Sequence, residues 1–132
     1  MRLLALALGL VLAASCGGAG APEPPAASPT PIPGAVLVTR ANDHGTVRAR
    51  VGDIIQIALG TEYEWRVDPP DGVVLARDPK KSYLLVRGTQ AIWLAAAPGR
   101  STVTATGTVI CPSGQACIMI AILFTTTVVV DP

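Results

Sequence analysis

The residues best suited to covalent chemistry in this chain are its three cysteines, Cys16, Cys111 and Cys117, which are accompanied by a single histidine, His44. A cysteine can be acylated, can pair with a second cysteine in a disulfide, or can bind a metal ion. A structural zinc site usually needs four ligands. Two nearby thiols and one histidine far away in the sequence do not supply them, so we expect no metal site.

Cys16 follows a short apolar leader. Arg2 precedes an uninterrupted apolar run over residues 3–14, which is the layout of a secretory signal peptide. The run is shorter than the roughly 20 residues that span a bilayer. Small residues, Ala13, Ala14 and Ser15, lie directly before Cys16. This order predicts that residues 1–15 are removed on export.

Small residues before a cysteine at the end of such a leader resemble the lipobox of bacterial lipoproteins. The resemblance implies that residues 1–15 are a lipoprotein signal peptide and that the Cys16 sulfur carries a diacylglycerol. It also implies a membrane-anchored protein on the extracytoplasmic side of the cell envelope. Ala13 stands where leucine is commonest. The alternative is a soluble secreted protein with a cysteine at its cleavage site.

Cys111 and Cys117 bound a short loop that contains Pro112 and Gly114. Proline and glycine in so short a segment favour a tight reversal, and disulfides persist in exported proteins. We therefore predict a Cys111–Cys117 disulfide that fixes the tip of one hairpin.

Residues 16–33 have the composition of a tether. Six prolines lie among glycine, alanine and serine, and Glu23 is the one charged residue. Such a segment has too little bulky apolar surface to offset the entropy lost on ordering. We expect a disordered, partly polyproline linker between the lipid and a single domain at residues 34–132.

Within that domain the hydrophobic pattern changes to that of strands. Residues 46–51 and 62–67 alternate between polar and apolar, and the apolar segment 53–59 follows a Gly52-Asp53 turn. Turn signals recur at 68–72, 78–81 and 98–99. Short strands at this spacing, without a sustained helical period, indicate an all-β sandwich or barrel.

Residues 116–130 contain no charge and could be mistaken for a membrane helix. The segment is too short for a span, and its isoleucine, threonine and valine residues favour strands. We expect one long strand with a bend or bulge near Thr125 to Thr127.

Three pieces of sequence resemble the chagasin-like inhibitors of papain-type cysteine proteases. They are residues 51–59, the Tyr63-Glu64-Trp65 segment, and residues 88–99 from Gly88-Thr89-Gln90 through Trp93 to Pro98-Gly99. The resemblance implies a single immunoglobulin-like antiparallel β-sandwich with Trp65 in its core. Segments like 98–105 also occur in generic bacterial immunoglobulin-like repeats.

The inhibitory loops of that family are not matched. An Asn-Pro-Thr-Thr-Gly loop should precede Tyr63, but only Gly60, Thr61 and Glu62 join Leu59 to it. A loop marked by Arg-Pro-Trp is replaced by the segment between the cysteines, and residues 88–90 alone could stand for the third loop. The resemblance therefore supports the fold more than the inhibition.

Enzyme chemistry has little support in the sequence. His44 is isolated in a turn-like Asn-Asp-His-Gly segment, and neither a Gly-x-Ser-x-Gly elbow nor a glycine-rich phosphate loop occurs. Glu62 and Glu64 share a face with Arg66, which favours an exposed charge ladder. We predict no enzymatic activity, no catalytic residues, no cofactor and no small-molecule substrate.

The charge balance argues against nucleic acid. Once Arg2 is removed with the leader, nine basic residues face nine acidic ones, without a basic patch. Lys80 and Lys81 are more simply a solvated turn, with some chance of contacting anionic lipid.

We therefore expect a non-enzymatic cell-envelope lipoprotein that displays a protein-binding or scaffolding module. The alternative is a chagasin-like protease inhibitor with altered loops, and a third possibility is a purely structural domain. The partners would be the membrane, through Cys16, and an unidentified envelope protein or protease. Recognition concentrates in loops on a rigid scaffold, so the candidate contact residues are Gly60, Thr61, Glu62, Gly88, Thr89, Gln90, Pro112, Ser113, Gly114 and Gln115.

Overall fold

Eight strands form within the part of the chain that the computed structural model describes, residues 29–132. In chain order they are β1 (Val36–Thr39), β2 (Thr46–Arg50), β3 (Ile54–Ala58), β4 (Tyr63–Val67), β5 (Leu75–Ala76), β6 (Ala91–Ala95), β7 (Gly99–Val109) and β8 (Ala121–Asp131). A short 3-10 helix, η1 (Arg40–Asn42), follows β1. The predicted leader, Cys16 and most of the predicted tether lie outside the described residues.

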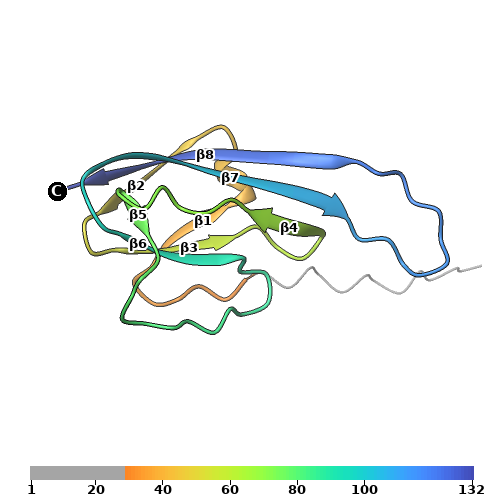
Figure 1. Ribbon diagram of the computed structural model, residues 1–132, viewed down its shortest axis with the longest axis horizontal. Helices are drawn as coiled ribbons and strands as arrows, with labels where there is room; N and C mark the ends of the chain where they lie inside the picture. Colours follow the sequence, from red (N-terminus) through yellow and green to blue (C-terminus); the bar gives the residue numbers. More distant parts are fainter. Residues whose placement is uncertain (1–28) are drawn as a thin grey trace, which may run out of the picture.

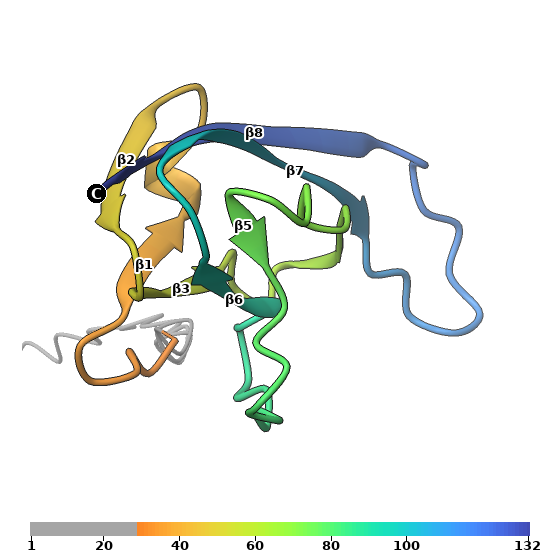
Figure 2. The same cartoon turned by 60° about the vertical axis from the view of Figure 1, so that its left-hand side comes forward.

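The strands form two four-stranded sheets, which pack as the two layers visible in Figure 1 and Figure 2. One sheet has the order β1-β3-β6-β5 and the other β2-β8-β7-β4. The predicted all-β sandwich is therefore confirmed. The sheets are mixed rather than wholly antiparallel, because β1 pairs with β3, and β2 with β8, in parallel. Between β1 and β3 the chain forms β2 in the other sheet. It then returns to the first sheet, where β3 runs beside β1 in the same direction.

The core lies between the sheets and comes from the alternate residues of each strand. In β8 the inward residues Phe124, Thr126, Val128 and Val130 are buried. Phe124 is opposite Ala105 of β7, so a large side chain is matched with a small one. The remaining core residues are Val38, Val47, Ala49, Ile55, Ile57, Leu59, Leu75, Trp93, Ala95 and Val103.

Trp65 lies at the edge of this core rather than at its centre. Its half-buried ring packs on Gly107, the residue opposite it on β7. A Cβ on Gly107 would come within 2.8 Å of the ring, which is closer than packed atoms approach. The absence of a side chain at residue 107 therefore allows the indole to lie against β7, and Trp93 is the more deeply buried tryptophan.

The β7–β8 hairpin is the longest element of the fold. Its strands pair one-to-one from Gly99 opposite Val130 to Thr108 opposite Ala121, so this ladder contains no bulge. The long strand predicted over residues 116–130 is confirmed only from Ala121, and the bulge predicted near Thr125 is wrong. Among residues 29–132, no helix is long and apolar enough to cross a membrane.

The domain begins slightly earlier than predicted. Gln56 of β3 is fully buried, and its side-chain amide donates to the Thr30 carbonyl oxygen at 3.0 Å and accepts from the Ile32 N–H at 2.8 Å. Because these bonds hold residues 30–32 on the sandwich, the last part of the predicted tether belongs to the domain. Gly34 is therefore not its boundary.

Candidate functional site

The three predicted contact loops lie toward one end of the sandwich. Residues 59–62 join β3 to β4, and the Gly60 N–H donates to the Gly88 carbonyl oxygen at 3.2 Å. Tyr63, directly after this loop, pairs with Val109 at the end of β7. The hairpin loop between β7 and β8 continues beyond that pair, as Figure 1 shows on the right. We call this the loop end of the sandwich.

The segment from Gly88 to Gln90 lies mostly inside the sandwich, and only Gln90 is partly exposed. Gly88 and Thr89 are buried, and the Gln56 side chain donates to the Thr89 hydroxyl at 2.8 Å. The Gln90 side-chain amide accepts from the Leu59 N–H and donates to the Gly60 carbonyl oxygen, both at 2.7 Å. Burial contradicts the predicted recognition role for Gly88 and Thr89, and the half-buried Gln90 holds the β3–β4 connection in place.

The connection through Gly60, Thr61 and Glu62 is short and fixed. Glu62 forms an ion pair with Arg40, whose guanidinium lies 5.2 Å from the centre of the Tyr63 ring. Of the predicted charge ladder, Glu64 and Arg66 are exposed on β4, whereas Glu62 lies before the strand, which begins at Tyr63. This loop presents one charged side chain and does not project from the sandwich.

The loop at Pro112, Ser113, Gly114 and Gln115 is fully exposed. The Gln115 N–H donates to the Pro112 carbonyl oxygen at 3.2 Å, and Gly114 has a φ of 82°. A glycine with positive φ at the third of four turn residues is typical of a type II turn. Cys111 and Cys117 are joined by the predicted disulfide, with their Cα atoms 5.8 Å apart.

Apolar side chains flank this turn on both sides. We define residues 109–120 as the hairpin tip. The Ile118 and Met119 side chains are 76% and 90% exposed, respectively. The other exposed apolar residues of the tip are Val109, Ile110 and Ile120. The sequence signal for Ile118, Met119 and Ile120 is the uncharged segment 116–130, whose composition predicts a strand rather than an exposed tip.

Removal of the disulfide should have a local effect. The double variant Cys111→Ser/Cys117→Ser should stay folded and lose roughly 2 kcal/mol of unfolding free energy, because the closed loop is short. The bridge also lies beyond the last paired residues of the hairpin, Thr108 and Ala121. Denaturant titration of both proteins measures this loss. Global unfolding of the double variant would contradict a local role.

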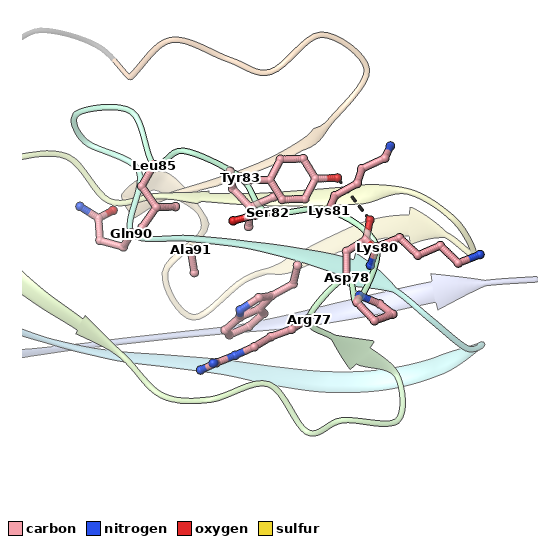
Figure 3. Close-up of a pocket in the computed structure, with 12 residues that line it drawn as sticks. Arg77, Asp78, Lys80, Lys81, Ser82, Tyr83, Leu85, Gln90 and Ala91 are labelled. Carbon is pink, nitrogen blue, oxygen red and sulfur yellow. Dashed lines mark hydrogen bonds between the residues drawn. The ribbon is translucent and has the colours of Figure 1, made fainter.

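A hollow lies elsewhere among residues 29–132, on the outer side of β6, and sequence reasoning did not find it. It measures about 720 Å³ and is formed by the long β5–β6 connection over β6. Figure 3 shows Tyr83 beside Asp78, to which its hydroxyl donates at 3.4 Å, and Lys80 and Lys81 extending outward. Both lysines are exposed, as a solvated turn predicts.

His44 lies in the turn between η1 and β2, with a φ of 55°. Its Nε2 is 3.7 Å from a carboxylate oxygen of Asp43, and its side chain is exposed. Residues 29–132 contain no group of three or more His, Cys, Asp or Glu side chains placed to hold a metal ion.

The opposite end of the sandwich is polar. Asp71 accepts hydrogen bonds from the N–H groups of Val73, Val74 and Leu75 and from the Ser101 hydroxyl. Burial acts to raise the pKa of Asp71, but these hydrogen bonds outweigh it and the pKa is lower than usual. Other charged residues at this end are Arg50, Asp53, Arg100 and Asp131.

Comparisons with known proteins add little to this description. No family model and no curated protein matches the chain. A search of solved structures finds the solution structure of amebosin, with a TM-score of 0.44 and 18% sequence identity. The alignment covers 74% of this chain and 98% of amebosin.

Proposed function

We propose that this chain is a non-enzymatic lipoprotein of the bacterial cell envelope. In this proposal Cys16 carries the lipid, and the β-sandwich is displayed as a binding or scaffolding module on the extracytoplasmic side. The order of basic residue, apolar run, small residues and cysteine over residues 2–16 supports the anchor.

The observation that carries the binding role is the hairpin tip. Paired strands hold its base, a disulfide closes it, and its apolar side chains are exposed. Soluble proteins rarely expose contiguous apolar surface without a partner for it. A tip held in this way loses little conformational entropy on contact, which favours binding.

The resemblance to chagasin-like inhibitors of cysteine proteases supports a similar β-sandwich, but the loops suggest a different function. Residues 51–59 and Tyr63-Glu64-Trp65 correspond to strands β3 and β4. Two inhibitory loops of that family are replaced here. One position holds the short connection at residues 60–62, which is hydrogen-bonded to Gly88, and the other holds the buried segment 88–89. We therefore favour the binding module over the inhibitor.

Titration against papain-type proteases separates these two functions. We expect at most weak inhibition, because one exposed tip replaces the several loops that such an inhibitor inserts together. The residual activity of the protease at rising concentrations of the full-length protein, held in detergent, measures this. Stoichiometric inhibition at nanomolar protein would contradict the proposal and favour the inhibitor. The double variant Cys111→Ser/Cys117→Ser would then show whether the tip carries the inhibition.

A further inference from the structure

The hairpin tip is apolar in a region of the chain without charge. No charged residue occurs between Arg100 and Asp131, a segment that includes both strands of the hairpin except for their ends at the base. The charged residues at the other end of the sandwich, such as Asp71 and Arg50, make that end hydrophilic by contrast. A domain with an uncharged apolar tip at one end and charged residues at the other is suited to the boundary between water and an apolar phase.

The described chain also begins at this end of the sandwich. Pro29 packs beside Gly88, where an added Cβ would lie 3.4 Å from the proline Cβ. Gly88 is in turn bonded to Gly60, which leads into Tyr63 opposite Val109. The point at which the chain enters the domain and the base of the hairpin tip therefore share the loop end.

The length of chain before Pro29 limits how far the loop end can lie from a lipid on Cys16. Twelve residues separate Cys16 from Pro29. At about 3.1 Å per residue for an extended proline-rich chain, they reach at most about 40 Å. A lipid on Cys16 therefore keeps the loop end within about 40 Å of the bilayer surface, whereas the charged end can lie farther away by the length of the sandwich. Tethering also raises the local concentration of the tip at that surface, so a weak contact suffices.

We propose that the hairpin tip docks into the interfacial layer of the bilayer that anchors the protein. This inference rests on the proposed function, because it takes the lipid on Cys16 as given. Ile118, Met119 and Ile110 enter the boundary between headgroups and acyl chains. The insertion is shallow, because backbone groups of an irregular loop still need water as a hydrogen-bond partner and cannot enter the hydrocarbon core. The docked tip fixes the orientation of the sandwich on the membrane.

Depth-dependent fluorescence quenching tests this contact with the full-length lipoprotein. Met119→Trp places a reporter on the tip, and Val73→Trp places a matched reporter on an exposed apolar residue at the charged end. Each protein is reconstituted into vesicles of phosphatidylethanolamine and phosphatidylglycerol, with or without brominated acyl chains. The wild type, with Trp65 and Trp93, supplies the background. We expect the tip reporter to shift to the blue and lose most of its emission in brominated vesicles, and the Val73→Trp reporter to keep its emission.

The outcomes distinguish this inference from the function on which it rests. Acylated protein that floats with the vesicles, without quenching of the tip reporter, overturns membrane docking and leaves the anchor intact. A blue shift without quenching by brominated lipid also overturns it and assigns the tip to a contact with a second copy of this chain, since no other protein is in the vesicles. Protein that carries no acyl chain and does not float overturns the anchor and the docking together.

Discussion

The Phe124→Ala variant should lose about 3–5 kcal/mol of unfolding free energy. Phe124 is 2% exposed and lies in the core between the sheets, opposite Ala105. Because its cross-strand partner is already small, no neighbouring side chain on β7 can fill the cavity that the truncation leaves. The denaturant concentration at the midpoint of unfolding measures the effect.

Leu123→Ala is the matched control for this variant. Leu123 is the preceding residue of the same strand, but its side chain points outward and is 63% exposed. Its truncation should change the unfolding free energy by no more than about 0.5 kcal/mol. Equal losses in the two variants would contradict the alternation of β8 and, with it, the packing of the sandwich.

The Cys16→Ser variant should carry no diacylglycerol. A serine hydroxyl at this position does not offer the sulfur that carries the diacylglycerol, so the leader should stay uncleaved or the chain should lack acyl groups. Intact mass after expression in a bacterial host distinguishes these forms from the acylated wild type, and a cleaved, unacylated chain should also leave the detergent phase. The variant Cys111→Ser/Cys117→Ser retains Cys16 and should partition like the wild type. If it also leaves the detergent phase, the disulfide rather than the lipid governs the attachment.

The sequence predicted where the strands lie in the chain better than which strands pair with each other. Residues 46–50 and 63–67 form strands as their alternation indicates, because alternation directly reports which face is buried. It does not report which strand lies alongside. The parallel pairing of β1 with β3 therefore had no signal in the sequence.

The extent of β8 shows a second limit of prediction. β-Branched residues recur from Thr125 back to Ile118 without a charge, proline or glycine between them, so composition alone predicts an uninterrupted strand. Pairing between β7 and β8 stops at Thr108 opposite Ala121. The residues beyond this pair belong to the loop that the Cys111–Cys117 disulfide closes. A strand needs a partner as well as a propensity, and the unpaired residues became the exposed hairpin tip.

The candidate contact surface was predictable only in part. Pro112 to Gln115 form an exposed turn, as proline and glycine between two cysteines indicated. Gly88 and Thr89 have an equally turn-like sequence, but tertiary contacts with Gln56 and Pro29 bury them. Their partners lie more than 25 residues away, so local sequence carries no signal for this burial.

The mass of the mature protein purified from bacterial membranes tests the central claim most directly. If the chain is a lipid-anchored display module, intact-mass and peptide analysis should find an N-terminus at Cys16 that carries acyl chains, with Cys111 linked to Cys117. Wild-type protein recovered as soluble, unacylated material that begins after Cys16 would contradict the account.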